Sequence, residues 1–149
     1  NTSNNFYLTG VQLEASDYCT DYEHRSYNDD LLRCQRYFNM IANGALGTSK
    51  AVSDGFFWGA GEFDFMYTFP VEMRTTPSIY QVTGSNYFRI QGAGASGGAT
   101  YIDGSWALQY ASNRTTSHYA TPDNNGTAGQ AGHITVNNSA ARLGYDAEL

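Results

Sequence analysis

EFDFMYTFPV, residues 62–71, is the stretch that decides the fold class of this chain. Its aromatic side chains recur at every second position from Phe63 to Phe69. Because successive side chains of a β-strand point to opposite faces, this period predicts a half-buried strand with one aromatic face. Pro70 indicates that the strand ends or lies at a sheet edge there, since proline cannot donate to a β-ladder.

Downstream of this stretch the sequence predicts a succession of short strands and turns. The strand-like segments are SIYQV, YFRIQ, TYI, SWALQYA, HITV and ARLGYDAEL, which begin at residues 78, 87, 100, 105, 133 and 141. Residues 112–132 are expected to form a loop, because Pro122 to Gly126 is a strong turn signal. Short strands with a turn signal about every 8–12 residues predict an all-β fold, an antiparallel sandwich or jelly-roll-like head.

Upstream, one segment has helical periodicity. SYNDDLLRCQRYFNMI, residues 26–41, spaces Leu31, Cys34 and Phe38 three or four residues apart and so predicts an amphipathic helix. Asn43-Gly44 follows as a stop signal. The apolar stripe allows two arrangements: a three-helix collar in an assembly, or packing of the helix on its own sandwich.

The change of period near residue 44 predicts the domain organisation. FYLTGVQLE, residues 6–14, alternates enough to predict a strand, so residues 1–44 are expected to be a connector that ends a preceding module. Residues 45–149 are expected to form the β-sandwich head. The chain starts with strand-like residues and shows no signal-peptide pattern, so we expect it to be a piece of a longer protein.

The two cysteines leave two interpretations open. Cys19 and Cys34 are fifteen residues apart, so one disulfide could close the loop between them. Alternatively, both are free thiols that behave as small hydrophobic side chains. Neither has the spacing of a metal-binding pair.

Composition and charge limit the classes of function. Charged residues make up 15% of the chain, and the formal net charge is −6. Nucleic-acid binding needs a positive surface against phosphates, and an anionic membrane surface would be repelled, so we expect neither partner. The sequence has no apolar run of about 18 residues, so we expect no membrane insertion. The surface is expected to carry mostly uncharged polar groups and tyrosine, which suits recognition of neutral polar ligands.

Several segments together resemble the C-terminal receptor-binding region of bacteriophage tail fibre proteins. In chain order they are GVQLE at 10–14, EHRSY at 23–27, LRCQRYF at 32–38, FPVEMRTTP at 69–77 and DAEL at 146–149. No single segment is specific, and their order carries the resemblance. Cys19 departs from the pattern, and residues 85–138 match no part of it.

The resemblance implies a distal fibre domain that acts as a homotrimer joined to the rest of the tail fibre. It implies adsorption through a host-cell receptor, a bacterial surface glycan or an envelope protein, without catalysis and without a cofactor. The implied location is the virion, with the fibre extracellular when it acts. Two alternatives stay open: a structural tip or connector without receptor contact, and a monomeric carbohydrate-binding module of an envelope enzyme.

Motifs of cofactor and catalytic sites occur only as partial matches. Residues 92–97 match GxGxxG and residues 94–98 match GxSxG, but both motifs need a following helix, and the next residues predict a strand and a turn. His118 and His133 have no carboxylate at a spacing that predicts a metal site or a triad. His24 is expected to have a structural hydrogen-bonding role.

Glu62 and Asp64 share the strand face opposite the aromatic residues. Their separation would suit the two carboxylates of a glycosidase. Acidic residues on that face are more simply the solvent side of a half-buried strand. The sequence therefore predicts no catalytic residue and no metal ligand.

The candidate receptor site lies between Ser105 and Asn125, where aromatic rings alternate with polar side chains. Sugars stack on aromatic faces, while amides and charged groups bind their hydroxyls, and such groups sit on loops that a rigid scaffold holds. The candidate glycan-binding residues are Trp106, Asn113, Arg114, His118, Tyr119, Asp123 and Asn124. Core packing is the competing interpretation for Trp106 and for Tyr110, which shares its strand face. Trp58 follows two phenylalanines and is expected in the core.

Overall fold

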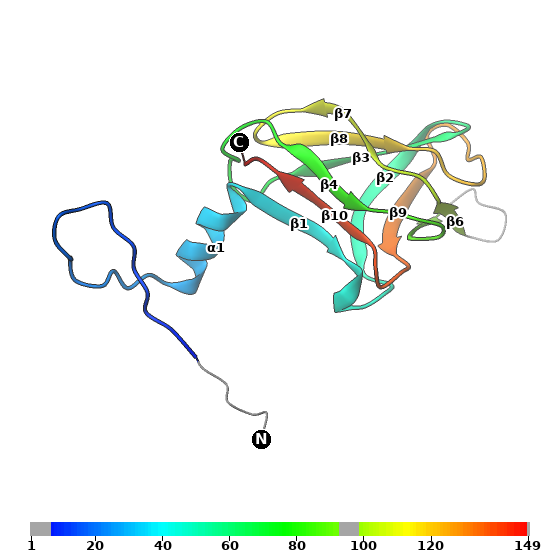
Figure 1. Cartoon of the computed structure of the whole chain (residues 1–149). Coiled ribbons are helices and arrows are strands. Elements are labelled where there is room, and N and C mark those ends of the chain that lie inside the picture. Colours follow the sequence, from blue (N-terminus) through cyan, green and yellow to red (C-terminus); the bar gives the residue numbers. More distant parts are fainter. Residues whose placement is uncertain (1–6, 93–98, 149) are drawn as a thin grey trace, which may run out of the picture.

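The computed structural model describes residues 7–92 and 99–148, and within them the chain has two antiparallel sheets and one α-helix. The sheets pack face to face, and the N-terminal part of the chain extends away from them (Figure 1). The predicted all-β, antiparallel sandwich is therefore confirmed. Residues 93–98, which hold most of the two glycine-rich motif matches, lie outside the described residues.

The smaller sheet has three strands in the order β1 (Phe38–Asn43), β10 (Arg142–Asp146) and β4 (Ser78–Val82). The larger sheet has seven strands in the order β6 (Ala99–Ile102), β5 (Phe88–Gly92), β9 (Ala131–Val136), β2 (Ala51–Gly59), β3 (Glu62–Thr68), β8 (Thr115–Ala120) and β7 (Ala107–Ala111). A short 3-10 helix, η1 (Gly44–Leu46), follows β1. The strands β2, β3, β8 and β7 are therefore successive neighbours at one edge of the larger sheet.

The core lies between the sheets and is formed by the inner faces of their strands. Phe63 and Phe65 of β3 are buried there, as their alternation predicts. Phe65 packs edge-on against Trp106, with ring centroids 5.0 Å apart. The smaller sheet contributes Leu143 and Tyr145 of β10, which are also buried. Burial of these large apolar side chains is the main stabilising contribution to the sandwich.

Strand β8 lies inside residues 112–132, so the prediction of a loop throughout that segment is wrong. The inward-facing residues of β8 are Thr116, His118 and Ala120, all buried. Because they are polar or small, the strand lacks the hydrophobic alternation by which strands are recognised.

Helix α1 (Tyr27–Gln35) is shorter than the predicted helix at 26–41. The Oγ of Ser26 caps it by accepting a hydrogen bond from the backbone N–H of Asp29 at 3.2 Å. Phe38, predicted to lie on the helix stripe, instead begins β1 and pairs with β10. No residue of α1 is buried, so the helix does not pack on its own sandwich.

The N-terminal arm, residues 7–26, contains neither helix nor strand in the described part of the chain. The predicted strand at 6–14 is therefore wrong over its described residues. The predicted domain boundary at residue 44 comes one strand too late, because β1 already belongs to the sandwich. Cys19 in the arm and Cys34 in α1 are both exposed and not bonded to each other.

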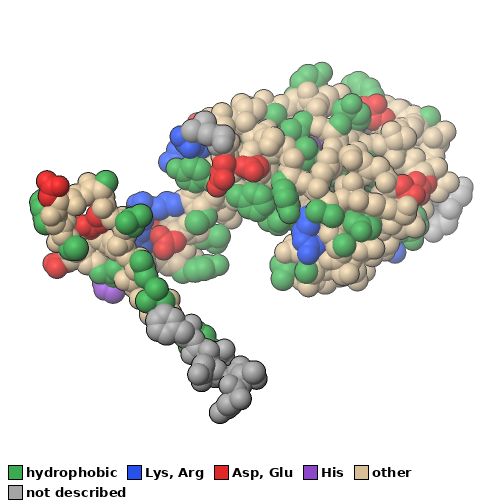
Figure 2. Space-filling model, in the orientation of Figure 1, with side chains coloured by type: hydrophobic (Ala, Val, Ile, Leu, Met, Phe, Trp, Pro, Cys, Tyr) green, Lys and Arg blue, Asp and Glu red, His purple; other side chains and the backbone are tan. Residues whose placement is uncertain are grey.

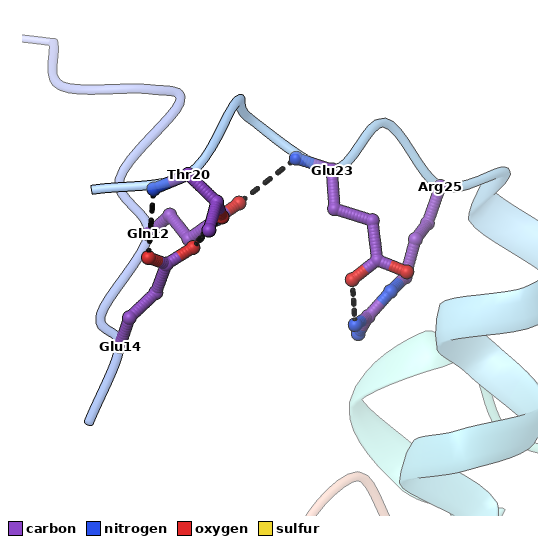
Figure 3. A network of polar contacts seen from close by, with 5 residues as sticks. All are labelled: Gln12, Glu14, Thr20, Glu23 and Arg25. Atoms are coloured by element: carbon purple, nitrogen blue, oxygen red, sulfur yellow. Dashed lines mark hydrogen bonds and ion pairs between the residues drawn. The ribbon is translucent and has the colours of Figure 1, made fainter. Parts of the chain in front are cut away.

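A small polar network holds the arm in a loop (Figure 3). The carboxylate of Glu14 accepts a hydrogen bond from the backbone N–H of Thr20 at 3.0 Å. The side-chain oxygen of Gln12 accepts one from the backbone N–H of Glu23 at 2.9 Å. Glu23 also forms an ion pair with Arg25. All these groups are exposed, so each interaction contributes little to stability.

Candidate functional site

The outer face of the larger sheet carries a groove that crosses β2, β3, β8 and β7. Its volume is about 400 Å³. The apolar lining residues are Phe56, Trp58, Met66 and Tyr110, and polar lining residues include Asp64, Gln109, Ser112 and Ser117. We call this feature the outer groove. Aromatic walls with a few polar groups are typical of small-ligand sites.

Trp58 forms part of the outer groove and is 68% exposed, so its prediction as a core residue is wrong. In β2, Phe57 points inward and stacks edge-on against Phe63, while its neighbours Phe56 and Trp58 point outward. A β-bulge between Phe57 and Gly59 increases the local twist at this position. The rings of Phe56 and Trp58, 6.3 Å apart between centroids, make one wall of the groove.

Tyr110 reaches the groove because of a second bulge, in β7. Leu108 lies opposite His118, but Tyr110 lies opposite Ser117, so Gln109 is one extra residue in the pairing. Without the bulge Leu108 and Tyr110 would share a face, as the sequence predicts. The extra residue turns Tyr110 outward, where it is exposed.

Asp64 is the charged side chain of the outer groove. It is only 5% exposed, and its Oδ1 atom has no hydrogen-bond partner in the described part of the chain. In the sheet it lies between Phe56 of β2 and Tyr119 of β8. Burial, helped by the nearby negative charge of Glu62, raises the pKa of the Asp64 carboxyl to about 6. The prediction that Asp64 is solvated on the outer side of its strand is therefore wrong, because the side chain is buried within that face.

Glu62 lies two residues before Asp64 on the same strand, and its negative charge helps to raise the pKa of the Asp64 carboxyl. Glycosidases that use two carboxylates hold them about 5–9.5 Å apart, on either side of the bond to be cleaved. Asp64 lines the groove but Glu62 does not, so the two carboxyl groups do not flank one ligand site. The pair therefore does not have the geometry of a glycosidase.

Two predicted binding residues, Trp106 and His118, are buried in the core and cannot contact a receptor in this structure. Trp106 lies just before β7 and exchanges two hydrogen bonds of 2.9 Å with the side chain of Gln81 through its backbone. His118 points inward because it is paired with Phe65 on β3. It stacks on that ring with centroids 4.6 Å apart.

His118 takes part in a buried polar cluster behind the groove. Its Nε2 atom lies 2.7 Å from the hydroxyl of Tyr145 and 2.9 Å from that of Thr116. Burial lowers the pKa of His118 to about 4, so the ring is neutral at pH 7. Its role in this structure is to fill the core.

Asn113 and Arg114 lie in the tight turn between β7 and β8. Both contact the carboxylate of Glu72, Asn113 through its side-chain amide at 2.5 Å and Arg114 through its guanidinium at 2.5 Å. These contacts fix the turn beside Ser112, a groove residue. Asn113 and Arg114 therefore lie next to the groove without lining it.

The other predicted residues are spread over the head. Tyr119 faces outward beside Asp64 and is partly exposed, but it is not among the groove-lining residues. Asp123 and Asn124 are exposed and hydrogen bond to Tyr101 and Thr100 of β6, the opposite edge strand of the larger sheet. The structure therefore does not gather the predicted set into one site.

A second apolar surface covers the outer face of the smaller sheet. It consists of Phe38 and Met40 of β1 and Tyr80 and Val82 of β4, all exposed. Gly144 of β10 is paired with Met40 on one side and with Tyr80 on the other. Because glycine has no side chain, nothing projects from the centre of this surface. Figure 2 looks onto this side of the molecule and shows hydrophobic side chains over the smaller sheet. We call it the small-sheet face.

Within residues 7–92 and 99–148, no cluster of three or more His, Cys, Asp or Glu side chains could hold a metal ion. No helix in the same ranges is long and apolar enough to cross a membrane. Comparisons with protein-family models, curated proteins and solved structures found no match to this chain.

Proposed function

We propose that this chain is the receptor-binding tip domain of a phage tail fibre, which binds a bacterial surface glycan without catalysis. It acts as a homotrimer on the virion and meets its receptor outside the host cell. The receptor site is the outer groove, in place of the segment that the sequence pattern favours.

The outer groove carries this proposal. Sugar rings present C–H faces that pack on aromatic side chains, and Trp58 and Tyr110 offer exposed rings on opposite sides of the groove. The hydroxyl groups of a sugar need hydrogen-bonding partners, which Gln109 and Ser117 supply. The walls stand on four paired strands, so little ordering is needed on binding.

The exposed surface of the chain supports the proposed assembly. A compact monomer of 16.3 kDa is expected to expose about 7,500 Å². This chain exposes 9584 Å². The excess of about 2,000 Å² is larger than the roughly 800 Å² that each partner buries in a standard interface. The arm and α1 account for much of it, since none of their described residues is buried.

The small-sheet face gives the assembly an apolar contact surface. Its four apolar residues adjoin α1 through Phe38, the first residue of β1. The helix exposes Leu31 and Leu32. An exposed apolar surface of this kind, here interrupted by Arg142 and Asp146 of β10, is typical of protein–protein interfaces. In the proposed homotrimer, the small-sheet face and α1 of each protomer pack against its neighbours.

A binding comparison of two variants tests the proposal. The full chain, Trp58→Ala and Tyr101→Ala are applied to an array of bacterial surface polysaccharides. Trp58 is largely exposed, so its replacement leaves the core intact, and we expect at least about 30-fold weaker binding. Tyr101 points outward from β6 at the other edge of the same sheet and is the matched control, expected to change binding less than about threefold.

Each possible result favours one function. Binding lost in Trp58→Ala alone supports the outer groove as the receptor site. No binding by the unaltered chain would favour a structural tip whose partner fibre protein contacts the host. Binding by a chain that light scattering shows to be monomeric would favour an isolated carbohydrate-binding module.

A further inference from the structure

Among residues 7–92 and 99–148, the buried carboxyl group of Asp64 lacks a hydrogen-bond partner for one of its oxygen atoms, and this indicates which kind of ligand the outer groove binds. A carboxyl group that is 95% removed from solvent is unfavourable unless a positive charge or several hydrogen bonds compensate it. Its Oδ1 atom has no hydrogen-bond partner among the described residues. The side chain nevertheless lines the groove.

The described lining of the groove supplies no compensating charge, because it contains no Lys, Arg or His. Among the described residues, the charged group that acts on this carboxyl is Glu62, which has a like charge and lies on the same strand. The neighbouring strands contribute uncharged side chains: Phe56 from β2, Tyr119 from β8 and Tyr110 from β7. When the carboxyl group is ionised, above about pH 6, the described groups around it therefore offer no compensating cation, and a bound ligand can supply one.

The groove walls favour an organic cation over a metal ion. Three aromatic rings line the same groove as Asp64, those of Phe56, Trp58 and Tyr110. An ammonium group over an aromatic face is attracted by the ring electrons, and tryptophan gives the strongest such attraction. A divalent cation needs several oxygen ligands, and no described cluster of three acidic, His or Cys side chains lies here.

We propose that the outer groove binds an organic ammonium group carried by a surface glycan, held between the carboxylate of Asp64 and the aromatic walls. This inference rests on the proposed function and names the ligand chemistry of that site. Two sources carry this chemistry: the free amine of an amino sugar, and the quaternary ammonium of a choline substituent.

The test uses the full chain and three small probes: glucosamine, choline and N-acetylglucosamine. Binding is followed by NMR or calorimetry at pH 7.5. We expect glucosamine or choline to bind at least about tenfold more tightly than the uncharged N-acetylglucosamine. The stronger of the two identifies the source of the ammonium group.

Asp64→Asn and Glu62→Gln are the matched variants. Asp64→Asn keeps the shape of the side chain but removes its charge, so we expect binding of the charged probes to fall at least about tenfold and that of N-acetylglucosamine to stay unchanged. Glu62→Gln removes a like charge that does not line the groove, and we expect it to keep the preference for the charged probes.

A pH series with choline adds an independent measurement, because the charge of choline does not change with pH. Asp64 ionises at about pH 6, so choline binding should strengthen between pH 5 and pH 7 in the unaltered chain. The other titratable groups beside Asp64 are Tyr110 in the groove, Tyr119 on β8 and Glu62 on the same strand. The Asp64→Asn variant keeps these groups and should show a flat profile.

The inference would be overturned if neither glucosamine nor choline bound more tightly than N-acetylglucosamine, or if Asp64→Asn left binding of the charged probes unchanged. Binding of Ca²⁺ alone with the same dependence on Asp64 would also overturn it. The proposed function fails separately: it fails if Trp58→Ala leaves binding to the polysaccharide array intact. Loss of array binding in Trp58→Ala together with no ammonium preference would keep the function and reject the ligand chemistry.

Discussion

The two outer faces of the sandwich are both apolar, yet they differ in shape and in polar content. The small-sheet face is a row of half-exposed side chains around Gly144, and the buried Asn39 of β1 beneath it points away from this face, with its side-chain oxygen 3.5 Å from the Tyr67 hydroxyl in the core. The outer groove is hollowed between two β-bulges and holds a buried carboxyl with an unpaired oxygen atom. A flat apolar surface needs only to be covered, whereas a hollow with an unpaired polar atom selects its ligand. We therefore assign the first face to protein contacts and the second to a small ligand.

The largest effect is expected when a methionine on each face is replaced by aspartate and the two variants are compared. Met40 belongs to the small-sheet face and Met66 to the outer groove. Met40→Asp places a charge in the proposed interface, so the mass in solution should fall from about 49 kDa, three times the chain mass, to 16.3 kDa. Light scattering after size exclusion measures this mass.

Met66→Asp is the matched control for that exchange. It should keep the trimer mass, because the groove lies outside the proposed interface. It should weaken glycan binding instead, since the charge replaces an apolar wall. Dissociation of the trimer by Met66→Asp, or a trimer that survives Met40→Asp, would reverse the assignment of the two faces.

His118 lies on the inner side of the larger sheet, and the outer groove lies on the opposite side of the same sheet. Its pKa is about 4 in the folded chain and near 6.5 when unfolded, so the unfolded state binds more protons between these values. Stability should therefore fall as the pH drops from 6.5 to 4, with His118 contributing about 2–3 kcal/mol. In His118→Gln the urea unfolding free energy should be lower at pH 7 and depend less on pH in this window. An unchanged pH slope in the variant would contradict the buried, neutral imidazole.

Asp64, on the outer side of the same strands, should have the opposite pH dependence. Its pKa is raised from 3.8 to about 6, so its neutral form favours the folded state at low pH and that contribution is lost as the pH rises through 6. Two pKa units correspond to about 3 kcal/mol, and we expect Asp64→Asn to stabilise the chain by about 1–3 kcal/mol at pH 8. Little change is expected at pH 4. A destabilised variant at pH 8 would show that a partner within the chain already compensates the charge.

The smallest effect is expected beside the groove, at the ion pair between Glu72 and Arg114. Both side chains are exposed, so the pair contributes less than about 1 kcal/mol, and less still at high salt. Glu72→Gln should change the unfolding midpoint only slightly and leave the trimer mass unchanged. A clear loss of glycan binding in this variant would extend the groove to the turn at Asn113.

The fold class follows from the sequence wherever one strand face carries large apolar side chains. Residues 62–68 show that alternation and form β3 as predicted. In β2 the alternation of large apolar side chains is not visible in the sequence. Gly55 occupies an inward position there, where a Cβ atom would meet the Phe63 ring at 2.6 Å. There the ring of the neighbouring strand fills the space that a side chain of β2 would otherwise take. In β8 the alternation is not visible because the core-facing residues Thr116 and His118 are polar.

The site could be predicted only in part, since it depends on strand pairing. The aromatic residues of the groove come from β2 and β7, which are separated in the chain and brought together by β3 and β8. Tyr110 faces outward only because of a bulge that no local pattern indicates. The exposed position of Trp58 could have been found, because it alternates with the inward-facing Phe57. The burial of Trp106 matches the competing interpretation that core packing holds it.

The three methionines of the chain allow one measurement that reports on both faces and the core together. Met40 is 37% exposed in the single chain, Met66 is 66% exposed and Met73 is 1% exposed. In a ¹³C-methyl methionine NMR spectrum with a soluble paramagnetic probe, only Met66 should be strongly broadened, because the proposed assembly would cover Met40 and the core covers Met73. A glycan ligand should then shift the Met66 signal alone. Strong broadening of Met40, or a ligand shift at Met40 instead of Met66, would contradict the division between an assembly face and a ligand groove.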